Sequence, residues 1–158
     1  MDCSVERGGG IMNRLNKITK LIVDILFYIG ILCVISVPFT VKYISGFYGY
    51  NSRETVIFAI MLIITGIAAV YILYEFKRMF RTLVGGNPFV AANVNSLKRM
   101  AVSCVIITAV YLVKCFMMFT FATVVIVIVF GIGTLFCLVL KDLFRQAVEY
   151  KEENDLTV

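Results

Sequence analysis

Four long apolar segments account for most of this chain and constrain what it can fold into. They run over residues 21–41, 55–74, 101–117 and 121–140. A helix of about 20 residues rises ~30 Å, which matches the hydrocarbon core of a bilayer. Hydrophobic residues make up 61% of the 158 positions and charged residues 16%, whereas soluble domains contain roughly 45–50% and 25%. The sequence therefore predicts an all-α integral membrane protein, folded as a four-helix bundle with helical cytoplasmic extensions.

The chain has room for a single folded unit. We assign residues 12–158 to one four-span membrane domain, with a helical hairpin at residues 75–99 and a helical tail at residues 141–158. Residues 1–11 include three consecutive glycines. They match neither a signal peptide nor the start of a packed helix. We therefore predict that they are a disordered extension, or that translation starts natively at Met12.

The distribution of basic residues predicts the topology. Twelve of the 15 Lys and Arg residues precede the first segment, separate the second from the third, or follow the fourth. Lys42, Arg53 and Lys114 are the exceptions. Cytoplasmic loops carry the excess of Lys and Arg in membrane proteins. We therefore expect a multi-pass protein of the bacterial cytoplasmic membrane with both termini in the cytoplasm. The net charge of +5 reflects this topology, and no direct nucleic-acid binding is expected.

Turn signals between the segments predict where the helices end. Pro38 lies near the outer end of the first segment, and the aromatic residues 39–50 are expected to form an external loop in the headgroup layer. After the second segment, a Gly-Gly pair favours a helix stop, and Asn87 followed by Pro88 is typical of a helix start. The third and fourth segments have almost no polar linker, and we expect a turn near Thr120.

Two ionisable residues lie within the apolar segments. Charged side chains inside a membrane are costly and are candidates for function. Asp24 lies one helical turn beyond Lys20, so we expect it to pair with Lys20 or with Arg99 near the cytoplasmic interface. Lys114 lies late in the third segment and can extend towards the opposite interface. Interface anchoring is favoured over a proton or ion relay for both residues.

The chain lacks the motifs on which most enzyme and metal chemistry depends. It has no histidine, and its five cysteines contain no CxxC pair and lie mostly within apolar segments. Zinc and haem sites would therefore lack their usual ligands. No nucleophile triad, zinc-protease motif or phosphate-binding loop is present. We predict a non-enzymatic protein with no catalytic residues, metal or cofactor.

Two charged extensions are predicted to project into the cytoplasm. The hairpin at residues 75–99 is basic, whereas the tail at residues 141–158 carries an apolar stripe and ends in acidic residues. Exposed ion pairs contribute only ~0–1 kcal/mol each, so the apolar stripe is expected to supply most of any docking energy. The residues expected to bind a partner are Lys77, Arg78, Arg81, Asn87, Phe89, Lys98, Arg99, Phe144, Glu149, Glu153 and Asp155.

The hairpin and the tail also carry a resemblance. Gly85-Gly86-Asn87-Pro88-Phe89 is followed by Asn93 and Leu97, and the chain ends in Glu153-Asn154-Asp155-Leu156-Thr157-Val158. From Met12 onward the chain resembles a family of small bacterial four-span membrane proteins known as a domain of unknown function of the 2975 type. Members of that family are often encoded beside a Cro-type helix-turn-helix regulator. The resemblance implies that such a regulator is a partner, and it supplies no catalytic residues.

These observations favour one function and leave others open. The preferred hypothesis is a membrane protein that docks a cytoplasmic partner and sequesters a small helix-turn-helix transcriptional regulator. The alternative is a small-molecule binding, transport or resistance protein that uses a cavity between helices, opening outward under residues 39–50. A third interpretation is a structural subunit of a larger membrane assembly. The sequence does not determine the oligomeric state.

Overall fold

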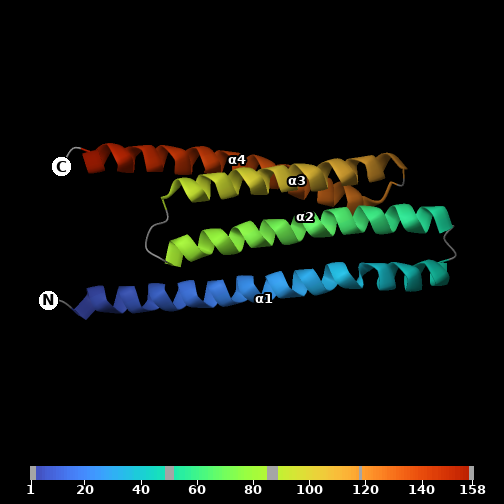
Figure 1. Cartoon of the computed structure of the whole chain (residues 1–158), viewed down its shortest axis with the longest axis horizontal. Coiled ribbons are helices and arrows are strands. Elements are labelled where there is room, and N and C mark those ends of the chain that lie inside the picture. Colours follow the sequence, from blue (N-terminus) through green and yellow to red (C-terminus); the bar gives the residue numbers. More distant parts are fainter. Residues whose placement is uncertain (1–2, 49–51, 85–88, 118, 157–158) are drawn as a thin grey trace.

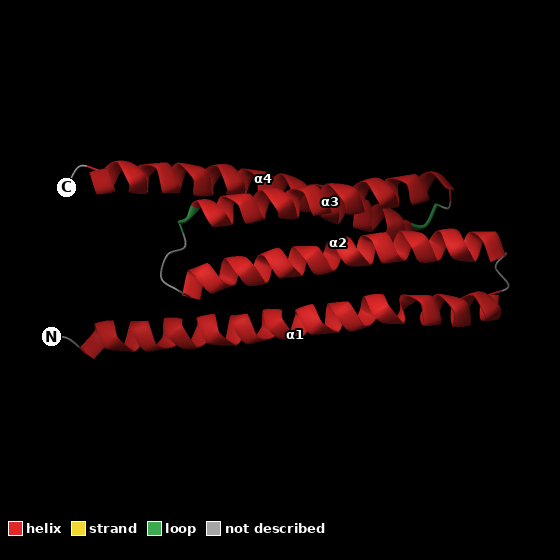
Figure 2. Ribbon diagram, in the orientation of Figure 1, coloured by secondary structure: helices red, strands yellow, loops and turns green. Residues whose placement is uncertain are grey.

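The computed structural model consists of four long helices (Figure 1). They are α1 (Cys3–Tyr48), α2 (Ser52–Val84), α3 (Ala91–Met117) and α4 (Phe121–Leu156). Helices and short connections are the only elements in the part of the chain that the structure describes (Figure 2). All four helices are long and apolar enough to cross a membrane. The predictions of an all-α fold and of a multi-pass membrane protein are confirmed.

The structure describes residues 3–48, 52–84, 89–117 and 119–156. Side chains are described for residues 18–43, 46, 53, 55–83, 89–117 and 119–154. Among the expected site residues, Asn87 and the side chain of Asp155 lie outside these ranges.

The helices form an open antiparallel row. In the described ranges, α1 packs on α2, α2 on α3 and α3 on α4, and no other pair of helices is in contact. The two termini and the α2–α3 connection lie at one end of the molecule, which we call the terminal end (Figure 1). The α1–α2 and α3–α4 connections lie at the other end, the loop end. Since α1 and α4 do not meet, α2 and α3 are the central helices.

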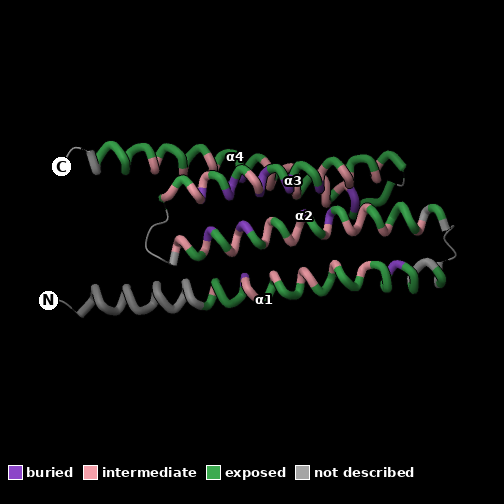
Figure 3. Tube along the Cα trace, viewed as in Figure 1, coloured by how far each residue is buried: buried purple, intermediate pink, exposed green. Residues whose placement is uncertain are grey.

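Most of the core lies along facing stripes of α2, α3 and α4, and α1 adds Val23 and Val41. On α3 the stripe repeats every three or four residues, as expected for helices packed with knobs-into-holes geometry, and α3 is the helix with the most buried residues (Figure 3). The outer faces of all four helices expose large apolar side chains, as lipid-facing helices do. The buried apolar residues are Val23, Val41, Ala68, Met79, Leu97, Met100, Ala101, Cys104, Ile107 and Cys137.

Helix α1 is longer than the sequence pattern predicted. It continues through Pro38 to Tyr48. The expected external loop over residues 39–50 is therefore wrong for residues 39–48, and residues 49 and 50 lie outside the described residues. Hydroxyl groups next to the proline bond backbone carbonyls, since Thr40 Oγ1 donates to Ser36 O at 2.9 Å. These bonds do not end on the carbonyl of Val34, which Pro38 leaves without its helical donor, but proline is in general better tolerated in membrane helices than in soluble ones. At the other end α1 begins at Cys3, so the helix includes residues 3–11.

The remaining helix ends are close to their predicted positions. Helix α3 begins at Ala91, three residues later than the expected start at Pro88, and Asn93 N donates to Val90 O at 2.9 Å in its first turn. The turn expected near Thr120 is confirmed: α3 ends at Met117, α4 begins at Phe121, and Thr123 N donates to Thr120 O at 2.9 Å.

Helices α1 and α2 approach closely at two glycines. A Cβ on Gly66 would lie 2.8 Å from Cγ2 of Val34, and a Cβ on Gly30 would lie 3.3 Å from Cδ1 of Leu73. Carbon atoms in contact are ordinarily separated by about 3.5–4.0 Å. Gly66 therefore permits a spacing between these helices that an alanine would not.

Candidate docking site at the terminal end

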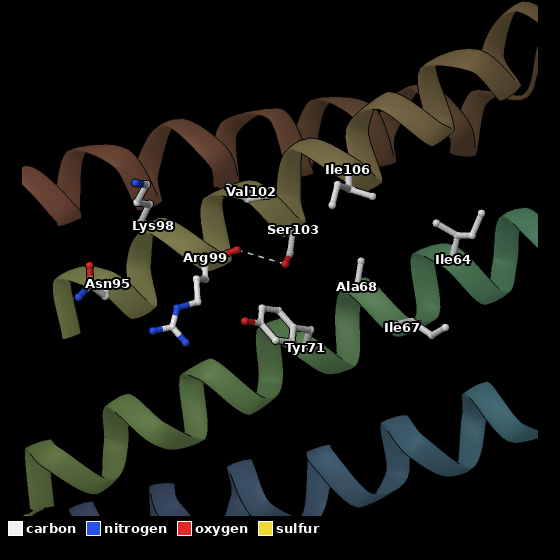
Figure 4. Close-up of a pocket in the computed structure, with 10 residues that line it drawn as sticks. All are labelled: Ile64, Ile67, Ala68, Tyr71, Asn95, Lys98, Arg99, Val102, Ser103 and Ile106. Carbon is white, nitrogen blue, oxygen red and sulfur yellow. Dashed lines mark hydrogen bonds between the residues drawn. The ribbon is translucent and has the colours of Figure 1, made fainter. Parts of the chain in front are cut away.

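The most deeply buried charge in the described structure belongs to Glu75 on α2. Its side chain is fully buried, and Arg99 Nη1 of α3 lies 3.0 Å from its Oε1 atom (Figure 4 shows Arg99). The Arg99 side chain keeps 42% of its surface exposed. A buried carboxylate requires a paired charge, because desolvation would otherwise disfavour it strongly. The pair therefore joins α2 to α3 while leaving part of the guanidinium accessible.

A second polar contact joins the same two helices closer to their connection. Thr82 Oγ1 lies 2.8 Å from Oδ1 of the buried Asn93 and 2.7 Å from the carbonyl of Met79. We call Glu75, Thr82, Asn93 and Arg99 the polar seam. Sliding α2 past α3 by one turn would separate both pairs and leave buried polar groups unsatisfied. The seam therefore fixes the register of the hairpin.

An aromatic contact attaches the tail to the hairpin. The ring centroids of Phe89, just before α3, and Phe144 on α4 lie 5.7 Å apart. This distance is within the range of favourable aromatic pairs. Phe89 keeps 44% of its surface exposed, and Tyr150 further along the tail is 70% exposed. The hairpin and the tail therefore form one surface that presents aromatic side chains.

Charged side chains are exposed on both the hairpin and the tail. Arg78, Arg81 and Lys98 are exposed on the hairpin, and Glu149 and Glu153 are exposed on the tail. The two extensions are in contact through the pair of Phe89 and Phe144. Glu149 forms its ion pair within the tail, where Arg145 Nε lies 2.9 Å from its Oε1 atom.

Asp24 pairs with a residue that the sequence analysis did not predict. Its Oδ1 atom lies 3.0 Å from Lys77 Nζ on α2, so the expected pairing with Lys20 or Arg99 is wrong. Lys77 Nζ also lies 5.3 Å from the centre of the Phe27 ring and 5.4 Å from that of Tyr28. Lys77, expected to bind a partner, is thus mainly a contact between α1 and α2. Asp24 pairs with Lys77 because α1 packs on α2, and Arg99 is not its partner because Arg99 pairs with Glu75.

Lys114 lies near the loop end and packs against aromatic rings. Its Nζ atom lies 4.7 Å from the centre of the Phe58 ring on α2 and 5.6 Å from that of Tyr111. Such cation–π contacts stabilise a lysine by about 0.5–2 kcal/mol. Asp24 and Lys114 are therefore both engaged in contacts between helices and do not share a site.

The pairing of Glu75 with Arg99 was not predicted from the sequence. Both residues belong to the hairpin at residues 75–99, where exposed side chains are expected. A signal was present, since Thr65, Ala68, Glu75 and Met79 follow a spacing of three, seven and four residues that places them on one helix face. All four are buried. An acidic residue on an otherwise buried face predicts a basic partner on the facing helix.

A groove of about 700 Å³ opens between α2 and α3 (Figure 4). Towards the terminal end it is lined by Asn95, Lys98 and Arg99, with Tyr71 beside Arg99. Away from the terminal end its lining is mainly apolar. The apolar lining includes Ile64, Ile67, Val102 and Ile106. The alternative function placed its cavity under residues 39–50, and none of the described side chains of that segment lines this groove.

The fold and the site define the class of protein. Four membrane-crossing helices with a polar seam and a charged surface at one end describe a small multi-pass helical membrane protein. In the described residues no group of three or more His, Cys, Asp or Glu side chains could hold a metal ion.

Comparison with known families then places the chain within this class. A family model described as a protein of unknown function, DUF2975, matches residues 12–158. The chain belongs to this family, as its resemblance implied. No curated protein and no solved structure matches it.

Proposed function

We propose that this protein is a non-enzymatic component of the bacterial cytoplasmic membrane that docks a small helix-turn-helix transcriptional regulator at its terminal end. The proposal includes the topology that the basic residues predict, with the terminal end in the cytoplasm. The observation that best supports the docking proposal is the contact between Phe89 and Phe144. Because this contact joins the hairpin to the tail, a soluble partner meets one continuous surface and not two independent segments.

The polar seam supports a docking role because it makes the surface rigid. Glu75 pairs with Arg99, and Thr82 contacts Asn93, so the hairpin keeps one register before any partner arrives. A preorganised surface loses less conformational entropy on binding than a mobile one. Exposed aromatic and arginine side chains are also the residue types that dominate binding energies at interfaces, and Phe89 and Arg81 are exposed here.

The acidic end of the tail supports a DNA-binding protein as the partner. Glu149, Glu152 and Glu153 are exposed on α4. DNA-binding proteins carry basic residues that contact phosphates, and an acidic helix complements the same residues. A regulator held in this way could not occupy its operator at the same time. Membrane docking would therefore sequester it.

Co-purification tests this proposal. The chain is co-expressed with the helix-turn-helix regulator encoded beside its gene, and recovery of the regulator is compared for the full chain, a truncation after Leu140 and the variant Glu149→Gln/Glu152→Gln/Glu153→Gln. We expect both changes to lower recovery. The matched control is Lys42→Gln/Arg53→Gln, which alters exposed charges near the loop end. Equal recovery from the truncated and full chains, or the absence of such a gene, would contradict the proposal.

A further inference from the structure

The groove between α2 and α3 changes character along its length. Asn95, Lys98 and Arg99 line it towards the terminal end, and Ile106 lies at the other end of its α3 wall. Over the 11 residues from position 95 to position 106, a helix rises about 16 Å. One leaflet of a bilayer has a hydrocarbon thickness of about 15 Å, half of the ~30 Å core. The groove therefore matches a lipid of one leaflet in length, with its polar end suited to the headgroup and its apolar part suited to an acyl chain.

The walls of the groove are open sideways. Val102 is 54% exposed and Ile67 is 58% exposed, although both line the groove. In a membrane these side chains face hydrocarbon, so a molecule can enter from the bilayer without crossing the protein. A site for a water-soluble ligand would not normally expose its apolar walls to lipid. The occupant is therefore expected to come from the membrane.

The polar end of the groove favours a negatively charged ligand, because Lys98 and Arg99 line it. Nη1 of Arg99 is paired with Glu75, but 42% of the Arg99 side chain is exposed. The guanidinium therefore has other N–H donors that a ligand can reach. Lys98 also lines the groove and is exposed, and Asn95 adds an amide. Ser103 Oγ donates to the carbonyl of Arg99 at 3.2 Å, so this hydroxyl is bonded within α3, between the polar lining at Arg99 and the apolar lining at Ile106 (Figure 4). Basic pockets between membrane helices bind phosphate headgroups.

We propose that this groove is a binding site for an anionic phospholipid of the leaflet at the terminal end. The lipid phosphate contacts Lys98, Arg99 and Asn95. One acyl chain lies between Ile64 and Ile67 on α2 and Val102 and Ile106 on α3. This site shares Lys98 and Arg99 with the basic hairpin, but its lining does not include Phe89, Phe144 or the tail.

Native mass spectrometry of the full chain, released from detergent after incubation with equal amounts of phosphatidylglycerol and phosphatidylethanolamine, tests the proposal. We expect the wild-type chain to retain phosphatidylglycerol preferentially. Lys98→Ala should lower this retention about fivefold, the effect of one basic residue at an anionic surface. Val102→Trp should lower it by filling the apolar part of the groove.

The controls are chosen from residues outside the groove. Val105→Trp alters a similarly exposed position, since Val105 is 50% exposed and Val102 is 54% exposed, and Arg53→Ala removes an exposed charge at the loop end of α2. Both should retain phosphatidylglycerol at the wild-type level. Excess glycerol 3-phosphate should not displace the lipid, because the acyl chain contributes to binding.

Several results would overturn the proposal. They are equal retention of the two lipids by the wild-type chain, unchanged retention by Lys98→Ala or Val102→Trp, displacement by glycerol 3-phosphate, or a lipid-free dimer that covers the groove. Loss of regulator binding in the co-purification experiment would leave the lipid result unaffected.

Discussion

At the scale of single residues, Glu75 and Arg99 differ in what they would lose if separated. The Glu75 side chain is fully buried, whereas the Arg99 side chain is 42% exposed. Removing one partner of a buried pair is costly because the other charge is left without compensation. Arg99 can turn towards water or lipid headgroups, and Glu75 cannot. The two substitutions should therefore have unequal effects.

We expect Arg99→Ala to destabilise the fold by about 3–5 kcal/mol and Glu75→Ala by a smaller amount, about 1–3 kcal/mol. The measurement is thermal unfolding in detergent followed by circular dichroism. A thiol-reactive dye provides a second readout, since Cys104 and Cys137 are buried. Each kcal/mol should lower Tm by about 2–4 °C in a chain of this size.

The double variant Glu75→Leu/Arg99→Leu is the control for this prediction. It removes both charges and preserves apolar volume, so it should recover much of the stability lost in Arg99→Ala. The interpretation fails if Glu75→Ala lowers Tm as much as Arg99→Ala does.

At the scale of helices, the spacing between α1 and α2 depends on Gly66. In a free helix, alanine is more favourable than glycine by about 1 kcal/mol. At position 66, however, the added Cβ would lie 2.8 Å from Cγ2 of Val34. Steric overpacking of this kind costs about 1–3 kcal/mol. We expect Gly66→Ala to lower Tm and Val34→Ala to restore it in the same background.

Gly131 on α4 offers a matched control. A Cβ at this position meets nothing within 4 Å, so Gly131→Ala should gain helix stability without a clash. Thermal unfolding of the two alanine variants, measured side by side, separates packing from helix propensity. A stabilising effect of Gly66→Ala similar to that of Gly131→Ala would show that α1 and α2 do not require this spacing.

The tail of α4 depends on a different contact. Phe144→Ala removes the ring that faces Phe89. Since an aromatic pair contributes about 0.5–1.5 kcal/mol, backbone amides in residues 141–154 should exchange with deuterium up to about tenfold faster. Phe136→Ala is the control, because Phe136 is 63% exposed on the same helix. Unchanged exchange in Phe144→Ala would mean that the tail is held by other contacts.

At the scale of the whole molecule, the proposed function requires one orientation in the membrane. We expect Tyr150→Cys, in a cysteine-free chain, to react with a membrane-impermeant maleimide only after the cells are opened. Thr120→Cys, at the loop end, should react in intact cells. Both positions are exposed in the structure. The reverse pattern would place the docking surface outside the cell.

Different properties of the chain were predictable to different degrees. The all-α membrane fold follows from local properties, because the length and apolarity of a segment decide whether it can cross a bilayer. The turn near Thr120 followed from the same lengths. The extension of α1 through Pro38 did not, because proline usually breaks a helix in water but is tolerated in membrane helices, where neighbouring helices and local backbone adjustments accommodate it.

The sequence by itself determined four membrane-crossing helices and the class of protein. Only the tertiary structure decided that Asp24 pairs with Lys77, that Glu75 pairs with Arg99, and that Lys98 and Arg99 line a groove. The physical reason is that these contacts join different helices. They depend on how each helix is rotated and shifted against its neighbour, which is set by the packing of side chains distant in the sequence.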